Sequence, residues 1–317
     1  MNDRIAGHTA GKYPDSWYAA TAPLLPSFPS LEGEETADVC VIGGGYTGLS
    51  AALHLKKKGY DVVLLETQRV GWGASGRNGG HVGTGQRADQ ASIEKWVGLE
   101  AAKGLWQLGL DAVEKVCELI DEHQIDCELG SGNLHLAAKP SHAGELQEEL
   151  EHLESQYGYQ QLSYLSPDAV AELTSAQGFY GALLDDGCRH LHPLKYAVGL
   201  ARAAAQAGVR IYEHSRAQPA PNGQSGAVKT AQGHVKSQHV VLGCNAYLGK
   251  LIPRLAGNIM PINNFVIATE PLPSHLLPRI NRDNLSMSDT LFVINYWKLS
   301  EDGRMLFGGG ENYSSRF

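Results

Sequence analysis

The chain has 317 residues, of which 43% are hydrophobic and 19% charged, which is typical of a globular protein and excludes general disorder. Its 34 acidic residues outnumber its 26 basic ones, and the net charge of −8 disfavours a nucleic-acid partner. We expect no membrane span, because three consecutive glycines interrupt the most apolar stretch, residues 39–55. The five scattered cysteines form no C-x-x-C motif and no apolar leader is visible, so we predict a reduced, cytoplasmic protein.

The N-terminal region opens with an irregular stretch and then changes pattern. Residues 1–35 are rich in Pro, Ser and Gly, and we expect a mostly irregular N-terminal arm. The apolar run DVCVI predicts a buried parallel strand, and the glycine-rich segment GGGYTG follows it. We expect a helix that is ended by Gly59, and the run DVVLLE predicts a second buried strand that ends at Glu66. A strand, a glycine turn, a helix and a strand within about 30 residues are typical of a βαβ unit.

Helical and strand patterns alternate through the rest of the chain. Helices are expected over residues 92–124, 142–157 and 194–207, with Ser166 capping a further short helix. Strands or hairpins are expected over residues 132–138, 180–185, 209–215, 228–235, 239–247, 263–270, 291–297 and 304–310.

This order of elements predicts an α/β (α+β) protein with two domains that are discontinuous in sequence. A Rossmann-like domain with a parallel sheet is expected from residues 36–90 and 190–257. A more β-rich domain is expected from residues 91–189 and 258–317. Such an arrangement places a ligand cleft between the two domains.

The first motif with a chemical meaning follows the first predicted strand and fits the pattern G-x-G-x-x-G. Gly43 allows a tight turn, Gly45 lets backbone approach a pyrophosphate, and Gly48 allows close helix packing. Phosphate is also attracted to the N-terminus of the following helix. Glu66 stands where a carboxylate accepts hydrogen bonds from a ribose diol and repels a 2′-phosphate. The motif therefore predicts a dinucleotide other than NADP, and a glycine turn without a ligand is the alternative.

The second motif, GWGASGRNGG at residues 71–80, begins a stretch with seven glycines in the fifteen residues 71–85, too dense for a helix. An NAD dehydrogenase does not need a second glycine cluster, whereas a larger dinucleotide with a ring system deep in the protein can use one. Backbone of this loop can approach the pyrophosphate, and Arg77 can offset phosphate charge. A solvated arginine in a flexible loop is the alternative interpretation.

Together, VCVIGGGYTGLSAALHL and LLETQRVGWGASGRNGGHV resemble the D-amino-acid-oxidase-type family of FAD-dependent oxidoreductases. The resemblance extends from about Tyr13 to the last residue. Within the family the chain is similar to the gamma-glutamylputrescine oxidoreductases, through the individually weaker stretches QIDCELGSGNLHLA, YGALLDDGCRHLHPL, AQGHVKSQHVVLGCNAYLG and LSEDGRMLFGGG.

The resemblance implies FAD, oxidation of an amine C–N bond with hydride transfer to flavin N5, and reoxidation by oxygen to give hydrogen peroxide. The implied substrate is a small amine, gamma-glutamylputrescine or a related one, and the Rossmann-like domain becomes the FAD-binding domain. A histidine bonds the flavin covalently in some relatives, but Arg77 occupies that place here, so we expect non-covalent FAD. The cofactor contacts implied by position are Gly43, Gly45, Tyr46, Thr47, Gly48, Glu66, Ser75, Arg77, Asn78, Gly79, Gly80, Ala217 and Asn245.

The family pattern also continues beyond Phe317. Its further part carries a Trp-x-Gly segment and a loop similar to Gly-Tyr-Ser-Gly-His-Gly that lies against the flavin ring. We therefore expect this chain to be C-terminally truncated and one wall of the flavin site to be missing. A catalytically incompetent, FAD-binding fragment is the alternative to an active enzyme.

Three residues are candidates for the substrate side, because the resemblance places the VINYWKL strand opposite the flavin. Tyr296 and Trp297 would form an aromatic wall that stacks on a polyamine chain and attracts its ammonium group; ordinary sheet packing is the alternative. His81 follows the second motif and could face the ring, with a surface-loop histidine as the alternative. These residues, Tyr296, His81 and Trp297, are our predicted catalytic candidates.

Other functions are disfavoured by particular features of the sequence. His190 and His192 have a spacing that metal ligands can use, but no third ligand accompanies them, and we predict no metal site. The GWGASGRNGG motif argues against an NAD-dependent dehydrogenase. A flavoenzyme acting on modified RNA bases is disfavoured by the charge of −8 and the lack of a basic stripe. The oligomeric state cannot be read from the sequence.

Overall fold

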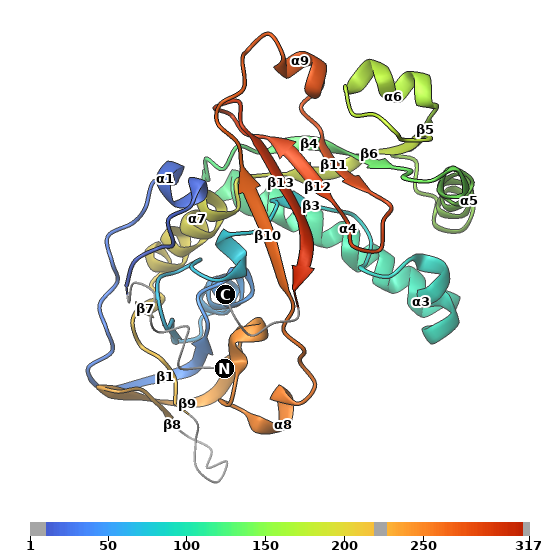
Figure 1. Cartoon of the computed structure of the whole chain (residues 1–317). Helices are drawn as coiled ribbons and strands as arrows, with labels where there is room; N and C mark the ends of the chain where they lie inside the picture. Colours follow the sequence, from blue (N-terminus) through green and yellow to red (C-terminus); the bar gives the residue numbers. More distant parts are fainter. Residues whose placement is uncertain (1–10, 219–226, 313–317) are drawn as a thin grey trace.

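The computed structural model describes residues 11–218 and 227–312. Its strands form two sheets, with the first in the lower half of Figure 1 and the second in the upper half. Parts of the predicted arm, FAD-binding domain and substrate domain (residues 1–10, 219–226 and 313–317) lie outside the described residues. The mixed α/β fold predicted from the sequence is confirmed.

The first sheet has five strands in the order β7-β2-β1-β9-β8. They are β1 (Gly33–Ile42), β2 (Val62–Leu65), β7 (Arg210–Tyr212), β8 (Ala227–Lys229) and β9 (Gly233–Leu242). β1 pairs in parallel with β2 and β9, and β2 pairs in parallel with β7, whereas β8 is antiparallel to β9.

Both faces of the first sheet are buried at β2 and at the end of β1, which explains the continuous apolar runs in these two strands. Val39 and Val41 pack in one core cluster with the helices α2 (Tyr46–Lys57) and α7 (Pro193–Gln206). Cys40 and Ile42 point to the opposite face and pack in a second cluster. The sheet is thereby fixed on both sides at the ends of β1 and β2, where the glycine turn begins.

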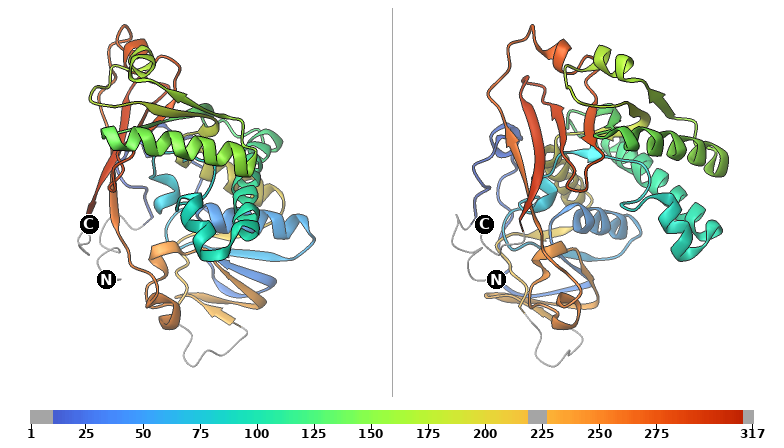
Figure 2. Two further views of the ribbon diagram at one scale, coloured as in Figure 1. Left: turned by 90° about the vertical axis from the view of Figure 1, so that its right-hand side faces the viewer. Right: turned by 45° about the vertical axis from the view of Figure 1, so that its right-hand side comes forward.

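The second sheet has eight strands, seven of them in the order β10-β13-β12-β11-β4-β6-β3, and β5 pairs with β6. They are β3 (His81–Val82), β4 (Gly130–Leu136), β5 (Leu162–Leu165), β6 (Ala182–His190), β10 (Asn263–Ala268), β11 (Ser286–Asp289), β12 (Tyr296–Leu299) and β13 (Met305–Asn312). The remaining helices are α1 (Trp17–Thr21), α3 (Gln90–Val97), α4 (Leu99–Glu122), α5 (Pro140–Tyr157), α6 (Pro167–Leu173), α8 (Pro253–Ala256) and α9 (Leu277–Ile280). Figure 2 shows α3, α5 and α6 gathered on the side away from β10 and β13.

Most predicted elements occur within a few residues of their expected bounds. The helical region predicted over residues 92–124 is two helices, because Gly98 takes a positive φ of 82° between α3 and α4. Ser166 caps α6 as expected, its hydroxyl accepting the Ala169 N–H at 3.3 Å. No helix in the described ranges is both long and apolar enough to cross a bilayer.

Three details differ from the predictions. The strand expected over residues 291–297 begins only at Tyr296, because the Asp289 carboxylate accepts the Leu291 and Asn295 N–H groups and holds the residues between β11 and β12 in a loop. β3 lies within the range 36–90 that we assigned to the first domain, yet it pairs with β6 in the second sheet. The strand expected over residues 239–247 already ends at Leu242, and its last part is half open, with Val240 48% exposed. The reason is that β8 pairs only with residues 234–236 of β9, so the far half of β9 forms the edge of the described sheet. The domain bounds themselves stay a prediction.

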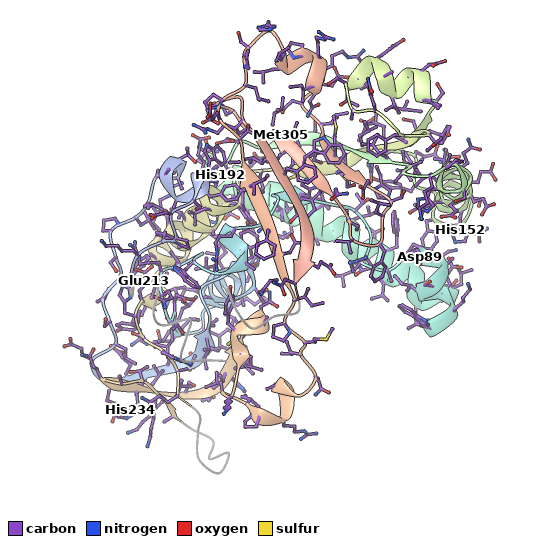
Figure 3. All side chains as sticks on the ribbon, viewed as in Figure 1. Asp89, His152, His192, Glu213, His234 and Met305 are labelled. Carbon is purple, nitrogen blue, oxygen red and sulfur yellow. The ribbon has the colours of Figure 1, made fainter. Side chains whose placement is uncertain are left out.

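Burial keeps two histidines, His190 and His192, in their neutral form, and Figure 3 labels the second of them. His192 caps α7: its Nδ1 accepts the Lys195 N–H at 3.1 Å, and its Nε2 lies 3.0 Å from the Thr21 hydroxyl. His190 Nε2 lies 2.7 Å from the Asn284 carbonyl oxygen, which must accept from it. Burial lowers the pKa of His192 to about 3 and that of His190 to about 4.

Because of these two histidines, we expect the free energy of unfolding to fall in mild acid. Below a pH of about 6.5 the unfolded chain binds protons that the folded chain cannot, so each histidine lowers the free energy of unfolding by up to about 1.4 kcal/mol per pH unit. Urea unfolding at neutral pH and at stepwise lower pH measures the slope. His192→Asn keeps a capping oxygen but does not titrate, and we expect a shallower slope; the exposed control His275→Asn should keep the original one. An unchanged slope in His192→Asn would contradict this account.

Candidate functional site

The glycine turn after β1 is packed too tightly for side chains at two of its positions. Gly43 has a φ of +109°, and a Cβ there would lie 2.5 Å from the Gly243 carbonyl oxygen. A Cβ on Gly48 would lie 1.8 Å from the Gly43 carbonyl oxygen. The tight turn and the close helix packing expected of these two glycines therefore match their surroundings.

Ser75 brings the second glycine cluster to the first. Its hydroxyl accepts the Tyr46 N–H at 3.0 Å, at the N-terminus of α2, and a Cβ on Gly45 would lie 2.8 Å from that hydroxyl. The two motifs are thus in direct contact at the helix end, where free N–H groups favour an anion.

Glu66 follows β2 and turns its carboxylate toward the glycine turn. One oxygen accepts the Gly44 N–H at 2.7 Å, and the other accepts the Gln68 N–H at 2.8 Å. Burial raises the pKa of Glu66, although these two hydrogen bonds oppose the shift. A carboxylate has about four acceptor positions, so the backbone hydrogen bonds leave room for a further hydroxyl donor.

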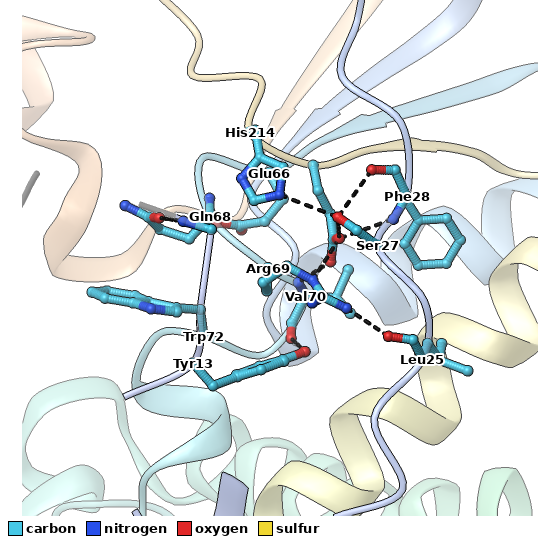
Figure 4. A network of polar contacts seen from close by, with 12 residues as sticks. Tyr13, Leu25, Ser27, Phe28, Glu66, Gln68, Arg69, Val70, Trp72 and His214 are labelled. Atoms are coloured by element: carbon cyan, nitrogen blue, oxygen red, sulfur yellow. Dashed lines mark hydrogen bonds and ion pairs between the residues drawn. The ribbon is translucent and has the colours of Figure 1, made fainter. Parts of the chain in front are cut away.

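A polar network behind Glu66 joins the N-terminal arm, the loop after β2 and the end of β7 (Figure 4). Its centre is Glu213, which is 0% exposed. One carboxylate oxygen accepts the Val70 N–H at 2.7 Å; the other accepts the Phe28 N–H at 3.0 Å and the Ser27 hydroxyl at 2.9 Å. The Arg69 Nε forms an ion pair with the same carboxylate at 2.7 Å.

A cavity of about 410 Å³ opens at the C-terminal ends of β1 and β2. This is the edge of a parallel sheet where ligands commonly bind. It is lined by six of the residues predicted to contact a cofactor: Gly43, Gly45, Glu66, Ser75, Ala217 and Asn245.

The other predicted cofactor residues lie around this cavity without lining it. Tyr46 packs inward and its hydroxyl donates to the Pro193 carbonyl oxygen at 2.9 Å, while Thr47 is exposed and Gly48 is buried in the helix packing. Arg77 lies over the Trp72 ring, 4.6 Å from its centroid, and donates to the Tyr247 hydroxyl at 3.0 Å. Its guanidinium therefore supports two side chains of the cavity wall instead of pointing into the cavity.

The last three residues of the second motif, Asn78, Gly79 and Gly80, fix the conformation of its loop. The Asn78 amide donates to the Ala74 and Ser75 carbonyl oxygens, and its oxygen accepts the Gly80 N–H at 2.8 Å. A Cβ on Gly79 would lie 2.5 Å from the Tyr296 ring. Asn78, Gly79 and Gly80 thus shape the segment that leads from the first cavity to His81.

A second cavity of about 630 Å³ begins at His81 and extends over one face of the second sheet. Burial lowers the pKa of His81 to about 3, and its Nε2 is buried with no hydrogen-bond partner in the described chain. The His81 and Tyr296 rings meet edge to face with centroids 5.6 Å apart. An imidazole nitrogen without a partner beside an aromatic ring indicates a place for a ligand.

Tyr296 and Trp297 do not form one wall. Tyr296 faces the second glycine cluster, and its hydroxyl donates to Asn264 Oδ1 at 2.5 Å. Trp297 is 7% exposed and stacks on Phe307 in the core on the other face of the sheet. Neighbouring residues of a strand point to opposite faces, so Trp297 is placed away from any site that Tyr296 borders.

Several cavity-lining residues escaped the sequence analysis. Trp72, Tyr247 and Lys250 line the first cavity, and Trp72 lay inside the second motif as its only large aromatic. Asn133 and His135 line the second cavity and alternate with leucines along β4, a pattern that marks a polar face. No triad of metal-binding residues occurs in the described ranges, and His190 and His192 make the separate hydrogen bonds given above.

The geometry fits a long dinucleotide. The second glycine cluster comprises residues 71–85. Its residues 72–75 line the cavity at Glu66, and His81 and residues 83–85 line the second cavity. Glu66 has spare acceptor positions for the hydroxyls of a ribose. Because Gly43 and Gly45 have no side chains, the turn leaves the N-terminus of α2 open to a phosphate. FAD has the extended shape and the adenosine diphosphate end that such a site accommodates.

The sequence profile described as FAD dependent oxidoreductase, the DAO family, matches residues 38–317, and the chain belongs to this family of FAD-dependent flavoproteins. It is 39% identical over 301 residues to the probable oxidoreductase OrdL of Rhizobium meliloti, covering 95% of this chain and 70% of that protein. It is also 39% identical over 306 residues to the gamma-glutamylputrescine oxidoreductase of Escherichia coli, covering 96% of this chain and 72% of that protein.

Solved structures share the fold. The glycine oxidase of Geobacillus kaustophilus superposes with a TM-score of 0.68 at 20% identity, over 88% of this chain and 72% of that one. An L-proline dehydrogenase of P. horikoshii superposes with a TM-score of 0.65 at 21% identity, over 89% of this chain and 71% of that one.

Proposed function

We propose that the protein oxidises the C–N bond of a small amine with non-covalently bound FAD, and that its substrate is gamma-glutamylputrescine or a related amine. The relationship to gamma-glutamylputrescine oxidoreductase supports the substrate class. The observation that carries the proposal is the continuity of the second glycine cluster, which borders the Glu66 cavity at one end and the His81 cavity at the other. One molecule of FAD along this loop connects a dinucleotide site to a substrate site.

The chain's own residues hold the adenosine and phosphate end of the cofactor. The Glu66 carboxylate accepts hydrogen bonds from the ribose hydroxyls, because Glu66 lines the cavity and its backbone hydrogen bonds leave acceptor positions. The glycine turn and the N-terminus of α2 face the pyrophosphate, and Ser75 supplies a hydroxyl at the same place. Ala217 and Asn245 border the cavity from the β7 and β9 sides.

The amine end of the site lies at His81 and Tyr296. Bound at this site, FAD would supply the hydride acceptor for oxidation of the amine to an imine, and its reoxidation by oxygen with uptake of one proton would give hydrogen peroxide. Neutral His81 can accept a hydrogen bond from the substrate nitrogen at its unpartnered Nε2, and Tyr296 gives that nitrogen an aromatic neighbour.

The absorption spectrum of the purified chain tests the proposal. We expect flavin bands, release of FAD on heating at close to one per chain, and peroxide production with gamma-glutamylputrescine. A colourless protein that takes up no added FAD would overturn the proposal, and release of NAD in place of FAD would point to a dehydrogenase. Bound FAD with no turnover of any amine would refute the enzymatic part.

Glu66→Ala is expected to weaken FAD binding at least about tenfold, because charge-assisted hydrogen bonds contribute about 1.5–3 kcal/mol each and 1.4 kcal/mol is tenfold in affinity. Fluorescence titration of the flavin-free chain measures the dissociation constant. The matched control is Glu122→Ala, which removes an exposed glutamate paired with Lys57 and should leave the affinity unchanged. Equal affinities for Glu66→Ala and the control would show that Glu66 does not hold the ribose.

A further inference from the structure

The floor of the second cavity is a polar face of four neighbouring strands. In the order β3-β6-β4-β11 the sheet presents His81, then Asp185, then the pairs Asn133–Ser286 and His135–Ser288, which are opposite each other in the β4–β11 register. The alternate residues of the same strands, including Leu134, Leu136 and Met287, fill the core on the other face. We name Asn133, His135, Ser286 and Ser288 the polar strip.

The polar strip lines a cavity, whereas the polar face of a half-buried sheet usually meets open solvent. Trp106 of α4 and Leu153 of α5 line the same cavity, and both are buried. Partly buried polar groups need hydrogen-bond partners. A cavity of about 630 Å³ lies within the size range of small-molecule sites, about 300–1,000 Å³.

The hydrogen bonds within the polar strip leave both donors and acceptors for a ligand. The Asn133 amide donates to the Ser286 hydroxyl at 3.0 Å, and Ser286 donates to the Gly132 carbonyl oxygen at 3.0 Å. His135 Nδ1 and the Ser288 hydroxyl are 2.9 Å apart, and Ser288 donates to Asn133 Oδ1 at 3.5 Å. An amide nitrogen has two hydrogens, an imidazole has two nitrogens and a hydroxyl oxygen has two acceptor positions. One Asn133 hydrogen, the His135 Nε2 and one acceptor position of Ser288 therefore stay available.

No member of the polar strip is charged. Burial lowers the pKa of His135, so its ring is neutral at pH 7. The neighbouring Asp185 carboxylate accepts the Thr84 and Tyr159 hydroxyls at 2.6 Å each and the Gly187 N–H at 2.8 Å, so its charge is already supported by donors. A floor of neutral donors and acceptors favours a neutral group that has both, and a secondary amide is such a group.

We propose that the polar strip binds an amide in the part of the amine substrate that is not oxidised, while the amine lies at the His81 end of the same cavity. This inference rests on the proposed function and names its specificity-determining residues. An amine that carries an amide satisfies the strip. A plain alkylamine leaves the strip's polar groups without partners, and such sites reject analogues strongly.

Two probes of equal length separate the contribution of the amide: N-acetylated diaminobutane, which contains it, and heptylamine, which does not. For the FAD-loaded chain we expect a higher kcat/KM with the acetylated diamine. Ser288→Ala and Asn133→Leu should each reduce this ratio of kcat/KM values about tenfold, the loss expected for a hydrogen bond of about 1.4 kcal/mol. The matched control Ser163→Ala changes an exposed serine of β5 and should keep the ratio.

Binding of N-butylacetamide, which has the amide but no amine, gives a readout that does not depend on turnover. Calorimetry should show binding to the wild-type chain and a dissociation constant raised about tenfold by Ser288→Ala. If the chain takes up FAD and oxidises both amines with equal kcat/KM, the inference is overturned while the proposed function stands. N-butylacetamide that binds Ser288→Ala and wild type equally would also overturn it. A chain that takes up no FAD but binds N-butylacetamide through Ser288 would overturn the proposed function alone.

Discussion

Replacing Glu213 by glutamine is expected to lower the free energy of unfolding by about 3–5 kcal/mol, the cost of breaking a buried ion pair. Glu213 is fully buried, and its carboxylate receives two backbone N–H groups, a hydroxyl and the Arg69 guanidinium. Glutamine leaves the largely buried guanidinium without a negative partner and turns an amide hydrogen toward at least one donor. Urea unfolding of the two proteins under identical conditions measures the difference.

The control for this prediction is Glu34→Gln, the same chemical change in a surface pair with Lys236 whose side chains are 48% and 54% exposed. We expect an unchanged unfolding midpoint, because exposed pairs contribute little to stability. Because Glu213 also holds Val70 in the loop after Glu66, Glu213→Gln should lose FAD at a lower urea concentration than it unfolds. Similar midpoints for the two variants would show that the network around Glu213 is not a stabilising centre.

Gly48→Ala is expected to abolish FAD uptake and to destabilise the chain by about 3 kcal/mol or more, at the top of the range for overpacking. The added Cβ would lie 1.8 Å from the Gly43 carbonyl oxygen, and backbone atoms cannot move aside as the end of a flexible side chain can. Relief requires α2 to shift away from β1, which opens the glycine turn. Flavin content after purification and the urea midpoint report the two effects separately.

Gly104→Ala is the matched control for this substitution. Gly104 lies within α4, and a Cβ there would meet no atom within 4 Å. Alanine favours a helix over glycine by about 0.5–1 kcal/mol, so we expect a small gain in stability and normal flavin content. If Gly48→Ala behaved like Gly104→Ala, the close packing of the turn would be unimportant for the cofactor.

The parts of the site that are local in sequence were predictable, and the parts assembled from distant strands were not. The first motif placed Gly43, Gly45 and Glu66 at one cavity, because a strand, a turn and a helix fix their relation within one βαβ unit. Strand alternation could also have separated Tyr296 from Trp297, since adjacent residues face opposite sides. The polar strip could not be predicted, because Asn133 and Ser286 meet although they are 153 positions apart in the sequence.

The parallel pairing of β1 with β9 also has a consequence for how the chain folds as it leaves the ribosome. Ile42 and Leu242 are neighbours in this pairing, and roughly 200 residues separate them in the chain. At about 5–20 residues per second, synthesis needs about 10–40 s to bring the second strand out after the first. During that time the glycine turn stands on the nascent chain beside the unpaired edge of β1, so the cofactor site is completed late in synthesis. Its completion requires that no other strand pairs with this edge of β1 before β9 emerges.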